Sequence, residues 1–581
     1  MSDILAQGRG WGLAVGPPLR IDDADAHAWD DEADLVIVGL GGAGVAAALE
    51  GLERGLSVIA VDRYAAGGSS AANGGIYYAG GGTAIQREAG ESDTAEAMFD
   101  YLRIEVDGAV SDATLRRFCE ESVASVDWLI GHGVKFNAKV WKQKCSYPPL
   151  DYFLYHPDSS LSADYARRAK PAARGHRAFV RNGKKAWGLG VGVYAPLRDA
   201  ALRLGLRYRR YAEARQMVLD RQGAVVGVRI LQIPEGSASA GRFARHFAAA
   251  AKWISALPPS FPLAGIVYGV GRWYLKRAQA IEARHRVSHV IRARRGVVLS
   301  AGGFIMNQPM IEHYSPRHAP GLPNGTLGDD GSGILLGASA GGALGRMDRI
   351  SSWRFINPPA AWAQGMLVNR EGRRFVNEIL YGASIGDAIV DQTGGKAWVI
   401  LDAGLRRLAG RQAGDVHLVP FQRDVARLNH LFNCVKAPTI AALADRIGVD
   451  RDNLQRALDD YNAAARGERS DPFGKARDEM TVLGGGPYYA IDASVDSRLL
   501  PLSTMSLGGL RIDEESGQVL GESGAPIAGL YAAGRNAIGV CSNVYVSGLS
   551  YADCIFSGRR VARHLAPVSS TGSNAGGSGE G

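Results

Sequence analysis

The stretch from residue 34 to residue 62, DLVIVGLGGAGVAAALEGLERGLSVIAVD, constrains the fold of this chain more than any other. A short apolar run typical of a buried parallel strand is followed by a glycine-rich turn, a helical pattern and a second apolar strand. Gly39, Gly41 and Gly44 fit G-x-G-x-x-G at the strand-to-helix turn, where bare backbone and a helix N-terminus can hold a pyrophosphate. Asp62 ends the second strand, where a carboxylate can accept hydrogen bonds from ribose hydroxyls. The stretch predicts an α/β, Rossmann-like dinucleotide-binding domain.

Two further glycine-rich segments, residues 63–83 and 508–539, indicate which dinucleotide is bound. A nicotinamide cofactor does not need a second glycine-rich segment so far along the chain. A flavin dinucleotide, whose adenine and isoalloxazine halves are both enclosed, is expected to need one. The arrangement favours FAD.

The order of five motifs resembles the flavoproteins related to fumarate reductase and the succinate dehydrogenase flavoprotein subunit. These motifs are GLGGAG, GGSSAANGG, RRGVVLSAGGF (294–304), EGRRFVNE (371–378) and GGLRID…GLYAAG. The resemblance covers most of the chain except a basic insert and the termini. It implies FAD, and because the segment 67–75 lacks the histidine of covalent-flavin members, the FAD is expected to be noncovalent.

The resemblance also implies individual cofactor-binding residues. Gly41, Ala43 and Gly44 would contact the pyrophosphate, together with Gly39 of the same turn, and Asp62 would contact the adenosine ribose. The remaining implied positions are Arg63, Ser69, Ser70, Asn73, Gly74, Gly75, Ala301, Gly302, Gly534, Arg535, Ser547 and Leu549. No metal ligands are expected.

The segment FVNEILYGASIGDA, residues 375–388, separates two kinds of chemistry within this family. The segment resembles a place in the acid-reducing branch where "NE" is followed closely by a catalytic arginine. Here Tyr381 stands at that place, and no arginine follows until Arg406. A permanently charged guanidinium suits a dianionic acid, and a neutral phenol suits a neutral ketone. The sequence therefore argues against a fumarate-type reductase.

With a tyrosine at this place, the chain resembles the 3-ketosteroid dehydrogenases. Within that group it resembles the Δ4 type more than the Δ1 type, in the segments SSAANGGIYYAGGGT and YVSGLSYADCIFSGRR. The resemblance implies that Tyr545 and Ser547 are catalytic. We assign Tyr545 as proton acceptor, Ser547 as relay or orienting partner, and Tyr381 as a second phenol that polarises the ketone or shares the proton. The alternatives are packing at a domain boundary for Tyr381 and backbone support of the flavin for Tyr545 and Ser547.

Two aromatic segments are candidates for contact with an apolar substrate. Tyr77 and Tyr78 either line the substrate cavity or pack in the core or against the flavin. The segment CSYPPLDYFLYHP, residues 145–157, reads as a loop that covers an apolar ligand or packs on the surface.

The motifs imply an α/β fold with a split, Rossmann-like FAD-binding domain and an inserted α+β capping domain that supplies Tyr381. The substrate is expected between the two domains. The expected boundaries are an N-terminal extension at 1–32, the FAD-binding domain at 33–345 and 485–566, the capping domain at 346–484 and a disordered tail at 567–581.

A basic insert at 233–287 interrupts two predicted strands. Its segment 241–286 holds eight Lys/Arg and one acid, Glu282, and so carries +7 of the chain's net charge of +8. Pro258, Pro259 and Pro262 divide it into two possible helices, whose aromatic and basic side chains are typical of an interfacial helix pair. We expect contact with an anionic membrane surface; the alternatives are a subunit contact or helices packed on this protein. Without a recognition motif, nucleic acid is not expected.

The five cysteines form no C-x-x-C pair, zinc spacing or haem site, and the N-terminus lacks the pattern of a secretory signal. We expect a cytoplasmic protein, peripheral on the inner face of the membrane if the insert binds there, whose electrons leave to a separate acceptor. The predicted activity is FAD-dependent dehydrogenation of a 3-ketosteroid, at C4–C5 before C1–C2. The alternatives are a fumarate-type reductase of an unsaturated acid and a membrane-docked flavoprotein without steroid turnover.

Overall fold

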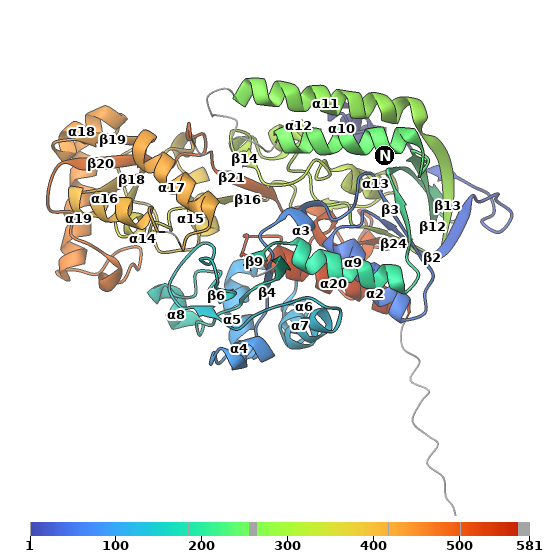
Figure 1. Ribbon diagram of the computed structural model, residues 1–581, viewed down its shortest axis with the longest axis horizontal. Coiled ribbons are helices and arrows are strands. Elements are labelled where there is room, and N and C mark those ends of the chain that lie inside the picture. The colour runs from blue at the N-terminus through green and yellow to red at the C-terminus, as the bar shows by residue number, and fades with distance from the viewer. Residues whose placement is uncertain (1, 183–184, 255–263, 416, 500, 567–581) are drawn as a thin grey trace, which may run out of the picture.

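The computed structural model describes residues 2–182, 185–254, 264–415, 417–499 and 501–566 (Figure 1). The tail at 567–581, predicted to be disordered, lies outside the described residues, as do the three prolines of the insert. Figure 1 shows a larger part built around a sheet and a smaller part that carries α14 to α19.

The larger part is built on a sheet whose central strands are parallel, which confirms the predicted Rossmann-like α/β fold. β2 pairs with β3 on one side and with β13 on the other, β3 pairs with β10, and the end of β13 pairs with β24. The strands are β2 (Asp31–Val38), β3 (Val58–Asp62), β10 (Arg207–Arg210), β13 (Val287–Leu299) and β24 (Pro526–Ala532).

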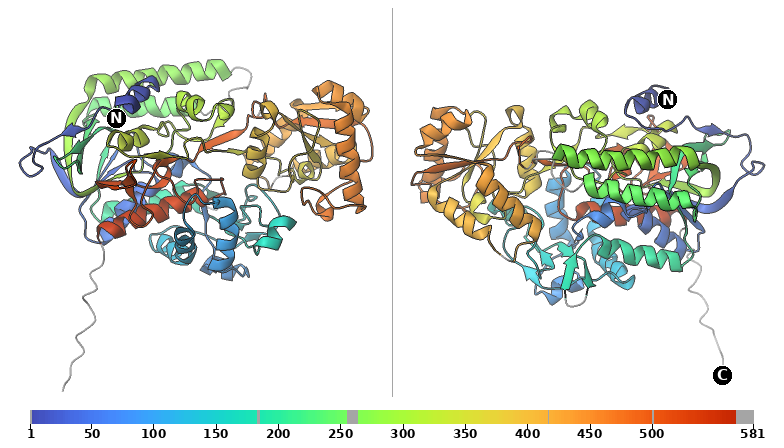
Figure 2. Two further views of the ribbon diagram at one scale, coloured as in Figure 1. Left: turned by 180° about the vertical axis from the view of Figure 1, so that it is seen from behind. Right: turned by 45° about the horizontal axis from the view of Figure 1, so that its top comes forward.

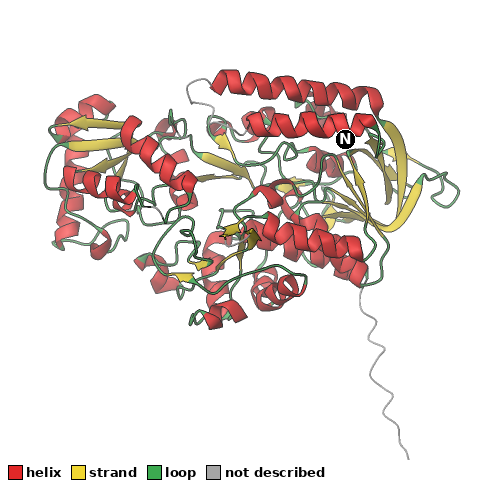
Figure 3. Ribbon diagram, viewed as in Figure 1, coloured by secondary structure: helices red, strands yellow, loops and turns green. Residues whose placement is uncertain are grey.

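Both faces of this sheet are buried, as Figure 3 shows by the helices on its two sides. Leu35 and Ile37 of β2 belong to one hydrophobic core, which also holds apolar residues of α2 (Gly42–Glu53) and α20 (Leu549–Leu565). Val36 belongs to a different core on the opposite face. This alternation follows from the two-residue period of a strand, and it explains why LVIV is apolar throughout.

Small residues let α2 and α20 approach each other closely. A Cβ atom added to Gly558 of α20 would lie 2.3 Å from the carbonyl oxygen of Ala43 in α2. The last helix of the chain therefore packs directly behind the first glycine-rich turn and fixes the start of α2.

The other edge of the sheet is antiparallel and carries the basic insert. β11 (Ala212–Leu219) pairs with β12 (Val225–Gln232), β12 pairs with β13, and β1 (Leu19–Arg20) of the N-terminal extension pairs with β11. Between β12 and β13 stand the two helices of the insert, as predicted. These are α10 (Ala238–Ile254) and α11 (Ala264–His285), which pack side by side across one face of the sheet (Figures 1 and 2).

The smaller part has its own sheet, in the order β17, β18, β20, β19, and its own hydrophobic core. β20 (Tyr488–Asp492) pairs with β18 and β19 of the cap. The predicted boundary at 485 placed this strand in the FAD-binding domain, so we move the proposed boundary to the chain after Leu502, the last residue of the cap's core. The other elements are α14 (Ala360–Ala363), β17 (Met366–Asn369), α15 (Gly382–Val390), β18 (Ala397–Leu401), α16 (Ala403–Gln412), α17 (Pro420–Phe432), β19 (Cys434–Ala437), α18 (Ile440–Ile447) and α19 (Arg451–Arg466).

A third group of elements packs beneath α2 and α20 and reaches the cap. Its small sheet has the order β4, β7, β6, β5. The elements are β4 (Ile76–Tyr78), α4 (Ala84–Glu88), α5 (Ala95–Val106), α6 (Asp112–Glu120), α7 (Ser122–Gly131), β5 (Val140–Trp141), β6 (Leu154–Tyr155), α8 (Ala163–Arg168) and β7 (Gly175–Arg177). Another sheet, β14 (Leu322–Pro323), β21 (Ser503–Ser506) and β16 (Ile350–Trp353), lies where the chain passes between the two large parts.

Candidate active site

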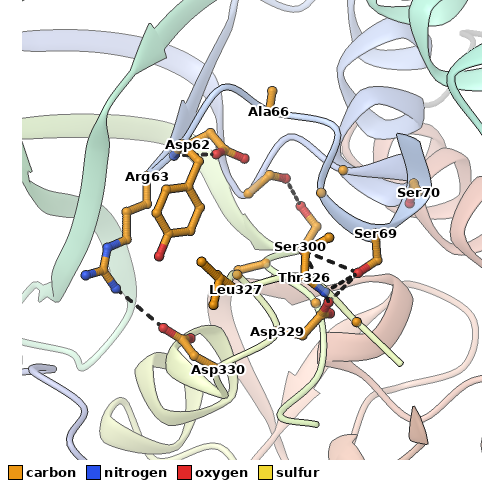
Figure 4. A pocket seen from close by; sticks show the side chains of 18 of the residues that line it. Asp62, Arg63, Ala66, Ser69, Ser70, Ser300, Thr326, Leu327, Asp329 and Asp330 are labelled. Carbon is orange, nitrogen blue, oxygen red and sulfur yellow. Dashed lines mark hydrogen bonds and ion pairs between the residues drawn. The ribbon is translucent and has the colours of Figure 1, made fainter. Parts of the chain in front are cut away.

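A cavity of about 660 Å³ opens at the carboxyl ends of β2 and β3 (Figure 4). This is where ligands bind in open α/β sheets, and the volume is typical of a cofactor site. Figure 4 shows Asp62 and Arg63 on one side of the cavity and Ser69, Thr326 and Asp329 on the other.

The glycine turn at the start of α2 has the shape that a pyrophosphate requires. Gly39 has φ of +93°, which only glycine adopts easily, and Gly41 has no side chain to cap the helix start, where the Gly42 N–H donates to the Ser70 hydroxyl (3.0 Å). A Cβ atom on Gly44 would lie 2.1 Å from the carbonyl oxygen of Gly39, so this glycine lets helix and strand pack closely. The bare backbone at the N-terminus of α2 faces the cavity through Gly41, Gly42 and Ala43 and favours an anionic group.

Asp62 lies at the end of β3, and its carboxylate accepts hydrogen bonds from the backbone N–H groups of Leu40 (3.0 Å) and Tyr64 (2.8 Å). These two bonds fix the carboxylate across the turn that contains Gly39. Burial raises the pKa of Asp62, and the backbone donors oppose that effect. The residue offers an oriented acceptor for a sugar hydroxyl.

Arg535, in the turn after β24, provides the clearest test of whether FAD fits this cavity. Its Nη2 donates to Oδ1 of Asp329 (2.8 Å), while its Nη1 is buried and has no partner among the described residues. A buried donor without an acceptor costs free energy. Arg535 lines the cavity, so a bound ligand can supply the acceptor. With the glycine turn at the start of α2 and the acceptor Asp62, Arg535 forms a donor and acceptor set that suits FAD.

Sequence reasoning missed Asp329 and Thr326, which organise this end of the cavity. Asp329 accepts from the backbone N–H groups of Gly303 (3.2 Å) and Thr326 (2.9 Å), and also from the Ser69 hydroxyl. The available signal was NGTLGDDGSG, residues 324–333, a turn-rich run with two acids before a helix.

Eleven of the predicted cofactor-binding residues line the cavity. They are Gly39, Gly41, Ala43, Asp62, Arg63, Ser69, Ser70, Ala301, Gly302, Gly534 and Arg535. The predicted residues outside its lining are Gly44, Asn73, Gly74, Gly75, Ser547 and Leu549. Asn73 instead holds its own loop through a bond from the Gly75 N–H (2.8 Å), and Leu549 is buried at the start of α20.

The predicted catalytic hydroxyls meet where the cap, the loop before α20 and the small β4 sheet join. The rings of Tyr381 and Tyr545 lie 6.4 Å apart between centroids. Ser547 accepts a hydrogen bond from the hydroxyl of Tyr155 (2.9 Å), a residue of the predicted loop 145–157. Gly548 follows with φ of +85°, and a Cβ there would lie 2.7 Å from the backbone nitrogen of Tyr78. The glycine after Ser547 thus lets this loop lie directly on β4.

The three phenols of this cluster differ in how strongly they resist ionisation. Burial raises the pKa of Tyr381 and Tyr155 well above 10, and the Ser547 hydroxyl lowers it in each case. Burial also raises the pKa of Tyr545, but both Ser547 and the charge of Arg535 oppose this. Tyr545 is therefore the phenol best placed to become a phenolate, and Tyr381 stays a neutral donor.

The Tyr381 hydroxyl is buried, and among the described residues it makes no hydrogen bond of ordinary geometry, although the Ser547 hydroxyl lies close enough to lower its pKa. Two basic residues that were not among the predicted site residues are the lysine beside the Tyr381 ring and an arginine bonded through its backbone to the next residue, Gly382. The Lys144 ammonium is 5.6 Å from the centre of the Tyr381 ring, and burial lowers its pKa to about 8. The backbone N–H of Arg354 donates to the Gly382 carbonyl (2.9 Å), and its guanidinium donates to the Ser494 carbonyl (2.5 Å), within the cap.

The structure places Tyr77 and Tyr78 in the hydrophobic core rather than in a cavity lining. The Tyr78 hydroxyl donates to Asp158 (3.1 Å), and Tyr77 lies near the ring of Phe136. Their packing therefore favours a core role for these two residues, since α20 covers one side of β4.

Comparisons with known proteins agree with this site. Residues 34–548 match the family model described as FAD binding domain. The chain is 36% identical to a 3-oxo-5-alpha-steroid 4-dehydrogenase of Comamonas testosteroni, over 90% of this chain and 96% of that protein. It is 27% identical to a 3-oxosteroid 1-dehydrogenase of Mycobacterium tuberculosis, over 88% of this chain and 94% of that protein.

A solved structure is similar over nearly the whole chain. It is the 3-ketosteroid Δ4-(5α)-dehydrogenase of Rhodococcus jostii RHA1 in complex with 4-androstene-3,17-dione, with a TM-score of 0.77 and 29% identity over 95% of this chain and 100% of that one. The chain belongs to the FAD binding domain family of flavoproteins. It is an FAD-dependent oxidoreductase, and its resemblance to the 3-ketosteroid dehydrogenases, Δ4 type before Δ1 type, is confirmed.

Proposed function

We propose that this protein desaturates the C4–C5 bond of a 3-ketosteroid of the 5α series, with noncovalent FAD. The observation that carries the proposal is the buried Tyr381 hydroxyl, a neutral donor that lacks a hydrogen bond of ordinary geometry among the described residues and lies beside Tyr545 and Ser547. A ketone oxygen would satisfy that donor. The 36% identity to a 3-oxo-5-alpha-steroid 4-dehydrogenase supports the regiochemistry and the 5α series.

Each residue of the cluster has a distinct task in this proposal. Tyr381 donates a hydrogen bond to the C3 carbonyl oxygen, which acidifies the protons on C4. Tyr545, with its phenolate favoured by Arg535, takes the C4 proton and becomes the neutral phenol, and Ser547, which accepts a hydrogen bond from Tyr155, orients it. Bound FAD supplies the acceptor for the hydride that leaves C5.

Replacing Tyr381 by phenylalanine is expected to weaken binding of a Δ4-3-ketosteroid about 10-fold, because the carbonyl loses its donor. The measurement is the steroid dissociation constant of the oxidised enzyme, from titration of the flavin spectrum. The same steroid without its 3-carbonyl is the control and should bind both enzymes equally. Equal losses for the two steroids would make Tyr381 a packing residue, as would no loss for either.

The exposed face of α11 supports a peripheral membrane location as part of the proposal. Ile266 is 67% and Trp273 is 48% exposed, and Arg272, Lys276 and Arg277 are exposed on the same helix. Within the described residues, no helix combines the length and the apolarity needed to cross a membrane. Apolar side chains among basic ones suit an anionic lipid surface, where a steroid partitions.

Charge reversal on α11 tests this location. Lys276→Glu is expected to weaken co-sedimentation with phosphatidylglycerol vesicles by at least about 5-fold, since one basic residue near an anionic surface contributes about 1 kcal/mol. Phosphatidylcholine vesicles are the control. Equal binding of the unmodified protein to both vesicle types would contradict the proposal.

An electron acceptor separate from this chain completes the proposed reaction.

A further inference from the structure

One wall of the cofactor cavity comes from the basic insert. Phe247, Ala251 and Ile254 of α10 line the cavity at a spacing of four and three residues, which places them on one face of the helix. Lys252 lines it as well. Of the two helices expected at a membrane, α10 therefore has one face turned toward the cofactor cavity.

An aromatic pair forms the centre of this wall. The rings of Phe247 and Tyr64 are stacked, with centroids 4.0 Å apart and planes at 15°. Tyr64 follows Asp62, the predicted ribose acceptor, by two residues, so the pair stands at the adenosine end of the cavity. Phe243 lies one turn earlier on α10 and packs against Phe247 at 5.9 Å between centroids.

A second cavity of about 370 Å³ lies on the outer side of this pair, between Trp11 of the N-terminal extension and α11. Tyr64 and Phe247 line both cavities. The pair thus separates the cofactor cavity from a space under the insert. Removing the Phe247 ring would join the two cavities and admit water beside the adenosine.

Buried charges hold the insert in this position. Glu282, the one acid of segment 241–286, is 4% exposed, and it pairs with Arg63 (3.3 Å) and Arg286 (3.2 Å). Arg63 also pairs with Glu213 (3.1 Å) and Asp330 (3.5 Å) of the flavin-binding part. A buried acid satisfied in this way ties α11 to the residue next to Asp62.

We propose that α10 is a built part of the FAD site and encloses the adenosine half, with Phe247 as a cofactor-binding residue. Lys252 adds a positive charge to the wall of a cavity that receives an anionic cofactor. The proposal rests on FAD binding and not on the identity of the steroid.

The test uses apoprotein prepared from the full chain and titrated with FAD, ADP and FMN, followed by quenching of flavin fluorescence or by calorimetry. Phe247→Ala is expected to weaken FAD and ADP about 10-fold each, a typical effect of losing an aromatic contact with a base, and to speed FAD release. FMN lacks the adenosine half, so its affinity should be unchanged.

Matched variants separate this role from a general effect on folding. Trp253→Ala removes a half-exposed aromatic side chain of α10 that does not line the cavity. Arg245→Met removes an exposed charge of the same helix. Both variants should leave FAD affinity unchanged. Phe247→Tyr keeps an aromatic ring and should bind FAD as tightly as the unmodified protein. Lys252→Met should weaken the binding of FAD and ADP more at low salt than at high salt. If Phe247→Ala fails to fold, Phe247→Leu and Lys252→Met carry the test. FAD and ADP affinities within 2-fold of the unmodified protein in these variants would overturn the proposal, as would equal losses for FMN.

Discussion

Replacing Tyr545 by phenylalanine is expected to lower turnover of a 3-ketosteroid by about 100- to 10,000-fold, the usual contribution of general acid–base catalysis. In the proposed mechanism the Tyr545 phenolate removes the C4 proton, and phenylalanine cannot accept a proton. Because Tyr545 acts only when deprotonated and burial raises its pKa, turnover of the unmodified enzyme should rise with pH above neutrality. That rise should be absent from the residual activity of the variant. The measurement is the pH profile of kcat with an artificial electron acceptor.

A matched control distinguishes catalysis from packing in this experiment. Tyr531 is a buried tyrosine of β24 outside the hydroxyl cluster, and Tyr531→Phe should keep turnover within about 3-fold of the unmodified enzyme. Tyr155→Phe should have a smaller effect than Tyr545→Phe, since Tyr155 acts through Ser547. Full turnover in the Tyr545→Phe enzyme would remove this residue from the mechanism.

Replacing Arg535 by leucine is expected to abolish retention of FAD during purification and to lower the free energy of unfolding by about 3–5 kcal/mol. The substitution removes a donor from the cavity and leaves Asp329 buried without its cation; the two side chains are 9% and 4% exposed. The measurements are the flavin-to-protein ratio and a urea unfolding curve. Arg535→Leu combined with Asp329→Asn should recover part of the stability but not the FAD.

The buried pair of Arg374 and Glu378 in the cap provides the control for stability. Arg374→Leu should also destabilise the protein, yet the folded fraction should keep its FAD, because neither residue lines the cofactor cavity. Normal FAD content in the Arg535→Leu protein would contradict the assignment of Arg535 to the site.

The parts of the site that were predictable are those whose geometry is local in sequence. The turn at Gly39, Gly41 and Gly44 and the terminal Asp62 follow from backbone requirements within one strand–helix–strand unit. Asp329 was not predictable in this way, because its partners Ser69 and Arg535 lie 260 and 206 residues away.

Tertiary contacts also decided what the sequence left open in the hydroxyl cluster. The motifs identified Tyr381, Tyr545 and Ser547, but Tyr155 lies in the segment 145–157, whose pattern indicated only a cover or surface packing, and Lys144 precedes that segment. Their roles and those of the three predicted hydroxyls stay predictions until the variants are measured.

Burial changed the reading of two other segments. The periodicity of β4 did not reveal that both its faces are covered, so Tyr77 and Tyr78 were equally compatible with cavity and core. In the insert, net charge described the outer surface of α11 but not the buried ion pairs of Glu282, which tie α11 to Arg63 beside Asp62. Composition averages over a helix pair, whereas function here depends on which side of each helix is turned inward.

Anaerobic titration of the FAD-loaded enzyme with a saturated 5α-3-ketosteroid tests the central claim most directly. The flavin absorbance should bleach in proportion to the steroid added, and NMR of the product should place the new double bond at C4–C5. A double bond at C1–C2 would contradict the regiochemistry. No bleaching by the steroid, with reoxidation of the reduced enzyme by fumarate, would show that the reaction is that of an acid reductase.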